Sequence, residues 1–138
     1  MHNAIQERPP PIMVSETEHS RLTGLAEAAL DRLPDIAGSL LAEMDRATVA
    51  TAASVPPDVV RMGSVAELHG GDGPRRITLV YPVDADIAAG RISVLTPLGA
   101  ALIGVRAGQF IRWSGRGGRE LSLKVVAVAP PTDEGRPS

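Results

Sequence analysis

Residues 15–47 read SETEHSRLTGLAEAALDRLPDIAGSLLAEMDRA, and this stretch predicts two amphipathic helices. Ser15 and Glu18 form an S-x-x-E capping box, in which both side chains accept hydrogen bonds from otherwise unpaired N–H groups of the first helical turn. Apolar side chains then recur at helical spacing, at Leu22, Leu25, Ala26, Ala29, Leu30 and Leu33. Pro34 ends the first helix, because the residue before a proline avoids the α region.

The second helix begins near Asp35, whose carboxylate is favoured by the positive end of the helix dipole. Gly38 weakens this helix by about 1 kcal/mol. Its apolar face consists of Ile36, Leu40, Leu41, Met44 and Ala47. Because the connection between the helices is very short, we predict that they fold back on each other as an antiparallel hairpin, or short coiled coil, over residues 15–48.

Beyond a small-residue linker at 49–57, the apolar pattern changes from helical spacing to alternation. We expect a short helix at 97–105 with proline in its first turn, and strands at residues 59–68, 75–81, 91–95, 109–114 and 119–128. Glycine-rich stretches at 70–73 and 115–118 supply turns between strands. Hairpin-linked strands with one short helix predict an antiparallel α+β domain over residues 58–130.

The two ends of the chain lack such patterns. Residues 1–14 are polar and proline-rich, which predicts a disordered segment, and we expect a mobile tail at 131–138. No apolar run approaches the roughly 20 residues that span a bilayer, and the start of the chain does not resemble a secretory signal. The chain has no cysteine, which excludes disulfides and thiolate metal sites. We expect a cytoplasmic monomer that does not contact membranes.

The net charge of −2 hides an uneven distribution. Residues 1–55 hold eight acidic and four basic side chains, whereas the remainder holds ten basic and eight acidic ones. An acidic N-terminal part on a mildly basic body orients the molecule in an external field. This imbalance is too weak to predict direct sequence-specific binding to nucleic acid, which usually requires a dense basic stripe.

The acidic residues at the predicted hairpin tip are the first candidates for chemistry. Asp31 and Asp35 flank the turn, and oxygen ligands of this kind hold magnesium. The alternative is that Asp31 is solvated and Asp35 caps a helix, both of which are ordinary helix physics. The three histidines form no metal-binding motif, so we expect no metal site.

Neither glycine-rich stretch predicts a phosphate site, because both lie between strands and lack a Gly-Lys-Ser/Thr ending. The serines lack a nucleophile elbow and an evident base. We therefore expect no catalytic residue and no cofactor.

Residues 96–104 read TPLGAALIG, and they mix small and aliphatic side chains on a short helix. One interpretation is a helix that covers the core, in which glycine and alanine allow close approach to the sheet. The other is a docking site, because Pro97 and Leu98 head the helix, where exposure is expected. The residues alone leave both interpretations open.

This segment resembles the S-P-[aliphatic]-[A/G]-x-[A/G]-L-[aliphatic]-G signature of the C-terminal domain of Gre transcript-cleavage factors. The preceding residues 91–95, RISVL, resemble the strand before the signature, and residues 104–109, GVRAGQ, resemble the turn after it. The glycine-rich stretch at 113–120 is similar to the hairpin that leads into the last strand of the family. Residues 76–82, 57–60 and 41–46 are similar to the Rnk subgroup, the regulators of nucleoside diphosphate kinase.

The resemblance implies an FKBP-like C-terminal domain that binds RNA polymerase at the rim of its secondary channel. In the family, the start of the signature helix meets a coiled coil of the largest catalytic subunit. Carried over, this points to Thr96, Pro97 and Leu98, with Gly99 permitting close approach. The cleavage factors also insert a long coiled coil whose acidic tip helps to hold a catalytic metal.

The hairpin departs from that family pattern. A helix from about Glu16 to Arg32 rises only about 25 Å, and the tip reads DRLPD rather than D-x-x-E. We therefore expect a non-catalytic regulator that occupies the channel mouth and competes with Gre-type factors. The alternatives are a cleavage factor that uses Asp31 and Asp35, and a prolyl isomerase suggested by the FKBP-like fold alone. No residue pattern indicates a contact with nucleoside diphosphate kinase.

Overall fold

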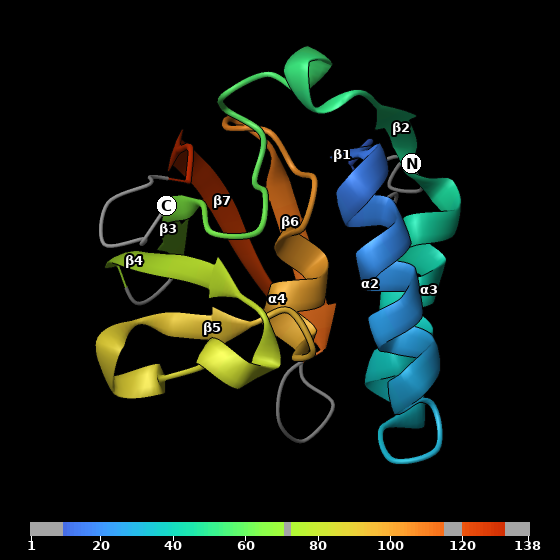
Figure 1. Ribbon diagram of the computed structural model, residues 1–138. Helices are drawn as coiled ribbons and strands as arrows, with labels where there is room; N and C mark the ends of the chain where they lie inside the picture. Colours follow the sequence, from blue (N-terminus) through green and yellow to red (C-terminus); the bar gives the residue numbers. More distant parts are fainter. Residues whose placement is uncertain (1–9, 71–72, 115–119, 132–138) are drawn as a thin grey trace, which may run out of the picture.

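The computed structural model describes residues 10–70, 73–114 and 120–131. Within them, a pair of helices lies beside a curled sheet, and one short helix packs between the two parts (Figure 1). The prediction of a mixed α+β fold is therefore confirmed. The sequence expectations for residues 1–9, for the turn at 115–118 and for the tail at 132–138 fall outside the described residues. No helix within the described ranges is long and apolar enough to cross a membrane.

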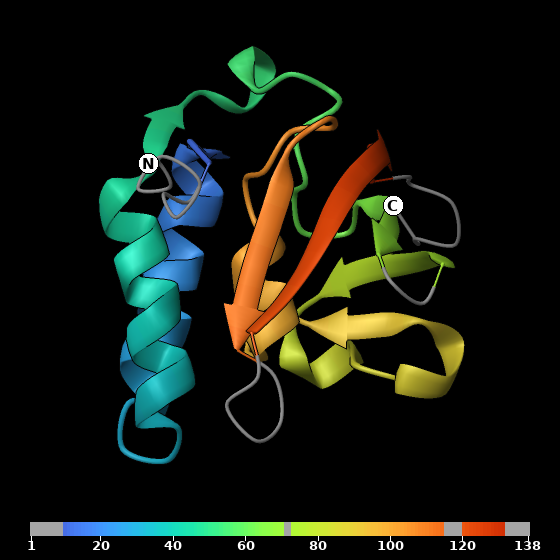
Figure 2. The ribbon, with the colours of Figure 1, turned by 180° about the vertical axis from the view of Figure 1, so that it is seen from behind.

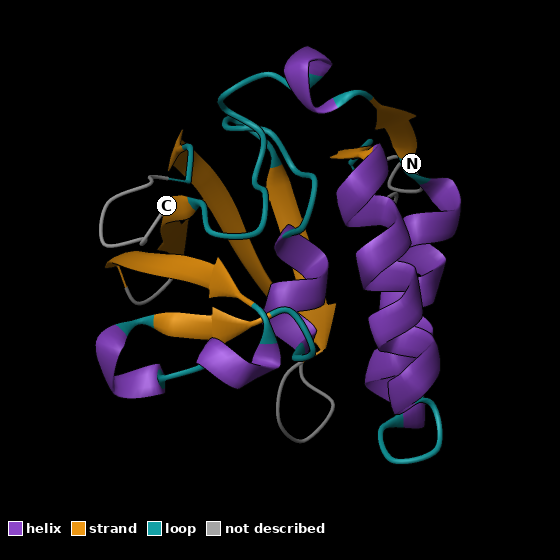
Figure 3. Ribbon diagram, in the orientation of Figure 1, coloured by secondary structure: helices purple, strands orange, loops and turns teal. Residues whose placement is uncertain are grey.

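The helical pair consists of α2 (Glu16–Ala29) and α3 (Pro34–Arg46), which lie side by side (Figure 3). Ser15 accepts a hydrogen bond of 3.1 Å from the Glu18 amide, so the predicted N-cap is present. The helices bury Leu22, Ala26 and Ala29 of α2, and Ala37, Leu40 and Met44 of α3. The first helix ends before the expected position, and Leu30 and Leu33 are exposed at the tip.

A small parallel ribbon closes the base of this helical pair. Residues of β1 (Met13–Ser15) pair with residues of β2 (Thr48–Ala50), so the strands before α2 and after α3 run together. Ile12 and Val14 are buried. The expectation of disorder up to residue 14 therefore differs from the structure at residues 12–14, because alternate apolar side chains reach the core. The expected linker at 49–57 contains the end of β2 and a 3-10 turn at Ala52–Ser54.

Five strands form the main sheet in the order β5-β4-β3-β7-β6. They are β3 (Val65–Gly70), β4 (Gly73–Val80), β5 (Arg91–Ser93), β6 (Phe110–Ser114) and β7 (Glu120–Ala129). The sheet is not wholly antiparallel as predicted, because β4 and β5 are parallel. The connection between them forms two 3-10 turns, Pro82–Asp84 and Ile87–Ala89, and carries the chain back so that β5 starts from the same end as β4.

The short helix α4 (Pro97–Leu102) covers one face of the sheet and also contacts α3. It ends earlier than expected, at Leu102, because Gly104 turns the chain with φ 82°. The largest fully buried side chains of this layer are Leu68, Leu79, Leu102, Ile103 and Ile111. These aliphatic side chains make one continuous core with those of the helical pair, so the two parts pack directly against each other.

Candidate partner-binding site

A dense set of hydrogen bonds fixes the chain just before α4. The Thr96 hydroxyl donates to the Ser93 carbonyl at 2.7 Å and accepts from the Gly99 amide at 3.0 Å, which makes Thr96 the N-cap of the helix. The Ser93 hydroxyl accepts from the Leu95 amide at 3.0 Å. Pro97 occupies the first helical position and is exposed. This turn therefore presents Pro97 to solvent on a rigid base.

The rest of the predicted docking segment faces inward. Leu98 is only 9% exposed, and Gly99, Ala100 and Leu102 are also buried. The docking role of Leu98 stays a prediction, but the expectation that its side chain is exposed is wrong. Leu98 is buried because α4 is six residues long and lies between the sheet and α3, which leaves little free surface beyond Pro97. Of the four predicted residues, Pro97 and the half-buried Thr96 remain accessible.

Gly99 allows α4 to approach the preceding strand. A Cβ atom at this position would lie 2.8 Å from the Val94 Cα and would overlap the Ser93 carbonyl oxygen. The sequence interpretation that small residues permit close packing of this helix thus holds at Gly99. The close contact fixes the direction in which Pro97 points.

The end of the same segment holds the N-terminal strand. Met13 donates its amide proton to the Gly104 carbonyl at 3.1 Å, and Gly104 donates to Val60 at 2.8 Å. A Cβ atom at Gly104 would lie 2.8 Å from the Ile12 Cβ. This junction escaped sequence reasoning, because no local pattern relates residue 13 to residue 104.

The hairpin tip does not gather acidic groups into a site. Asp31 and Asp35 are both exposed, and Asp35 lies in the first turn of α3 rather than at its N-cap. The N-cap is Leu33, which makes no side-chain hydrogen bond, so the interpretation of Asp35 as a capping residue is wrong. No group of three or more histidine or acidic side chains suited to a metal ion occurs among the described residues.

A polar cluster between α2 and the sheet domain was also missed. Burial raises the pKa of Glu18 above its usual value, while Arg61, the Met62 backbone and Arg21 act in the opposite direction. Burial likewise raises the pKa of Tyr81, whose ring lies 4.8 Å from the Arg21 guanidinium carbon. The Glu18 Oε1, Arg61 Nε and Tyr81 hydroxyl are buried without hydrogen-bond partners in the described part of the chain. The removal of these polar groups from water is therefore energetically unfavourable at this junction.

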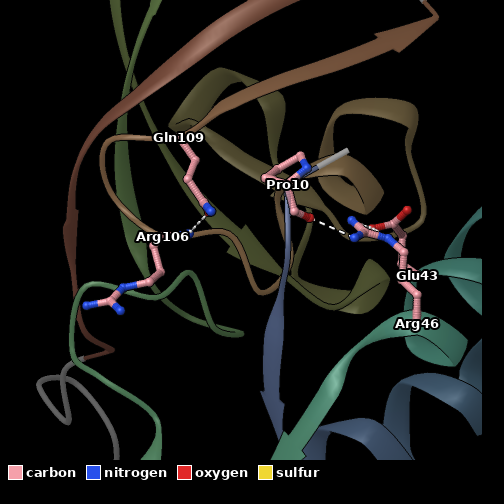
Figure 4. A network of polar contacts seen from close by, with 5 residues as sticks. All are labelled: Pro10, Glu43, Arg46, Arg106 and Gln109. Atoms are coloured by element: carbon pink, nitrogen blue, oxygen red, sulfur yellow. Dashed lines mark hydrogen bonds and ion pairs between the residues drawn. The ribbon is translucent and has the colours of Figure 1, made fainter. Parts of the chain in front are cut away.

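A second polar contact ties the N-terminal segment to α3 (Figure 4). The Arg46 guanidinium donates to the Pro10 carbonyl at 2.7 Å and to the Glu43 carboxylate at 2.6 Å. Nearby, Gln109 accepts a hydrogen bond of 2.7 Å from the Arg106 amide and closes the turn before β6. The first contact holds the N-terminal segment against the end of α3, whereas the second is local to the turn before β6.

Comparisons with known proteins identify the family of this chain. Residues 55–130 match the model described as "Transcription elongation factor, GreA/GreB, C-term", and residues 10–49 match the model described as "Rnk N-terminus". The Regulator of nucleoside diphosphate kinase of Escherichia coli K12 is 38% identical over 122 residues, covering 86% of this chain and 89% of that protein. The chain belongs to the GreA/GreB family, with an Rnk-type N-terminal part.

Two further relatives support this membership. Transcription elongation factor GreA of Rhodospirillum rubrum is 36% identical over 111 residues, covering 75% of this chain and 71% of its own length. The solved structure of the prokaryotic transcription elongation factor GreA/GreB from Nitrosomonas europaea superposes with a TM-score of 0.71 at 36% identity. That match covers 87% of this chain and 98% of the other. As a member of the GreA/GreB family, the chain is a transcription-related regulator.

Proposed function

We propose that this GreA/GreB family member is a non-catalytic regulator that binds RNA polymerase at the rim of the secondary channel and competes there with Gre-type factors. Family membership supports the partner. The observation that carries the proposed contact is the exposure of Pro97 on a turn whose backbone is fixed by Thr96, Ser93 and Gly99. A rigid apolar group loses little conformational entropy on binding.

The four predicted site residues take different roles in this proposal. Pro97 makes the principal contact, and Thr96 holds the turn and lies at the edge of the contact. Leu98 and Gly99 act from inside, because their burial sets the position of α4. We also propose that the hairpin at 15–48 and the body at 58–130 work as a joined unit, which the contact of α3 with α4 supports.

We propose that the chain does not stimulate transcript cleavage, because its helical pair is too short to reach the active centre of the polymerase. The 14 residues of α2 rise about 21 Å at 1.5 Å per residue. The exposed Asp31 and Asp35 stand at a tip with no third acidic or histidine ligand among the described side chains. Neither feature favours a hairpin that binds a catalytic metal ion. We therefore propose that the hairpin occupies the channel mouth without taking part in catalysis.

A direct test is co-purification with core RNA polymerase. Pro97→Asp places a charge at the proposed contact, whereas Pro82→Asp places the same charge at another exposed proline that begins a short helical turn. We expect Pro97→Asp to lose the polymerase and Pro82→Asp to retain it. Equal retention by both variants would remove Pro97 from the site.

A further inference from the structure

The two helices of the pair contact the sheet domain in different ways. Buried apolar side chains join α3 to the short helix α4, whereas α2 extends charged side chains toward residues 61, 62 and 81. Figure 2 shows the helical pair beside the sheet, with its tip at the far end of the helices from the segment that joins it to the sheet domain. Because Glu18 lies in the first turn of α2, a small change at the charged contact moves the tip by a larger amount.

The sheet-domain side of this charged contact is held in place by hydrogen bonds. The Ser64 hydroxyl accepts from the Arg61 amide at 2.8 Å, and the Ser64 carbonyl accepts from the Leu79 amide at 3.1 Å. This turn is therefore attached to β4, and Tyr81 directly follows the same strand. The backbones of Arg61 and Tyr81 are fixed by the sheet, so α2 supplies the side of the contact that can move.

The polar atoms of the contact lack part of their hydrogen bonding. The Glu18 Oε1, the Arg61 Nε and the Tyr81 hydroxyl are buried without hydrogen-bond partners among the side chains that the structure describes. The Arg21 guanidinium carbon lies 4.8 Å from the centre of the Tyr81 ring. Burial of polar and charged groups without partners is costly, and separation of the two sides returns these groups to water. A change of one charge can therefore alter the balance between a closed and an open junction.

Glu18 is the group whose charge changes within the acidic to neutral range. Burial raises its pKa above 4.5, while Arg61, the Met62 backbone and Arg21 oppose the rise without cancelling it. Burial also raises the pKa of Tyr81 above 10, so the phenol stays protonated wherever Glu18 titrates. The charge of the junction therefore changes through one carboxylate that faces two arginines.

Other ionisable side chains near this junction have different surroundings. The His19 Nε2 lies 3.1 Å from the Met44 carbonyl oxygen, so this ring faces α3. Glu16 is exposed, and the Asp58 carboxylate lies 3.2 Å from the Arg106 guanidinium. We therefore assign the response of the junction to Glu18.

We propose that Glu18, Arg21, Arg61 and Tyr81 form a pH-sensitive latch between the helical pair and the sheet domain, which closes when Glu18 takes up a proton and loosens when Glu18 is charged. The direction follows from linkage, because the closed junction binds the proton more tightly than an open junction in which Glu18 is solvated. The latch is therefore strongest below about pH 4.5 and weakens as the pH rises through the raised pKa of Glu18.

This inference goes beyond polymerase binding, because it assigns a regulatory element to the junction between the two parts of the chain. The latch sets the direction of the hairpin relative to Pro97, and its effect on competition with Gre-type factors rests on the proposed function. The movement itself does not rest on that function, so it can be measured on the chain alone.

The test is a distance measurement on the full chain as a function of pH. The chain has no cysteine, so Ala28→Cys and Ala85→Cys place spin labels at exposed positions of α2 and of the loop after Tyr81. We expect pulsed electron paramagnetic resonance to give one narrow distribution of distances near pH 4.5 and an additional distance whose share grows toward neutrality. Circular dichroism at each pH restricts the comparison to folded protein.

Single substitutions in the labelled chain separate the latch from a general effect of pH. Glu18→Gln should keep the narrow distribution at every pH, because the amide stays neutral. Arg61→Gln should move the transition to a higher pH, because Arg61 lowers the pKa of Glu18. Glu27→Gln, which changes an exposed carboxylate farther along α2, is the matched control and should respond like the wild type.

Three results would each overturn the proposal. They are a wild-type distribution that stays constant from pH 4.5 to neutrality, a pH response that persists in Glu18→Gln, and an Arg61→Gln transition that does not move to higher pH. Co-purification with polymerase reports separately on the proposed function. Because the distances are measured without polymerase, failure of one proposal is distinguishable from failure of the other.

Discussion

The Met13 amide donates a hydrogen bond of 3.1 Å to the Gly104 carbonyl, which joins the strand before the helical pair to the turn after α4. Gly104 has φ 82°, and a Cβ atom there would lie 2.8 Å from the Ile12 Cβ. The base of the hairpin therefore packs against position 104, where only glycine fits. This contact links the orientation of the hairpin to the segment that carries Pro97.

Substitution of Gly104 tests this junction. We expect Gly104→Ala to lower the free energy of unfolding by at least about 2 kcal/mol, because backbone strain and overlap with Ile12 add together. Gly108→Ala is the matched control, since Gly108 has φ 96° but a Cβ atom there would meet no atom within 4 Å. Denaturant unfolding of both variants measures the difference. Equal losses would show that contact with Ile12 contributes nothing.

A second glycine comparison tests the packing of α4. Alanine normally stabilises a helix interior relative to glycine by about 1 kcal/mol. We expect that effect for Gly38→Ala in α3, where a Cβ atom meets no atom within 4 Å. Gly99→Ala should act in the opposite direction, because its Cβ would overlap Ser93 and Val94. Thermal unfolding that shows stabilisation by both variants would contradict the close approach of α4.

Stability should depend on pH through Glu18. Burial raises its pKa above 4.5, so the folded state binds the proton more tightly than the unfolded state. The free energy of unfolding contributed by this group therefore falls as pH rises from about 4.5 through the raised folded pKa. Glu18→Gln removes this loss, so its stability relative to the wild type should increase with pH across that window.

Urea unfolding at a series of pH values measures this difference. Glu16→Gln is the comparison, since Glu16 lies in the same helical turn but is exposed. A constant difference between Glu18→Gln and the wild type from pH 4.5 to neutrality would contradict the buried environment assigned to Glu18.

We predict that the chain does not stimulate transcript cleavage. Backtracked transcription complexes incubated with the wild-type chain should keep their transcript length, and Asp35→Asn should change nothing. A cleavage-competent Gre factor is the positive control. Shortening by the wild type that is abolished by Asp31→Asn or Asp35→Asn would establish the alternative function and contradict the argument from hairpin reach.

Much of the local structure was predictable, because it depends on neighbouring residues. The Ser15 cap, the apolar stripe of α2 and the proline that begins α3 define the two helices. Strands β4, β6 and β7 differ from their predicted ranges by at most two residues at either end. Alternation of side chains identifies a strand but not its direction, which is why the parallel pairing of β5 was missed.

The remaining errors concern contacts between distant segments. The β1 strand has three residues, and its burial depends on β2 and Gly104, which lie far along the chain. Leu98 was expected at the surface because it heads a helix, but α3 packs against that helix and encloses it. The Glu18 cluster joins positions separated by more than 40 residues, so no spacing rule reveals it.

The most direct test of the central claim is displacement of a labelled Gre factor from core RNA polymerase by this chain. We predict that the wild type and Pro82→Asp displace the factor at similar concentrations, whereas Pro97→Asp requires at least about tenfold more protein, as expected for loss of about 1.4 kcal/mol at one contact. Failure of the wild type to displace the factor, or equal displacement by Pro97→Asp, would contradict the account.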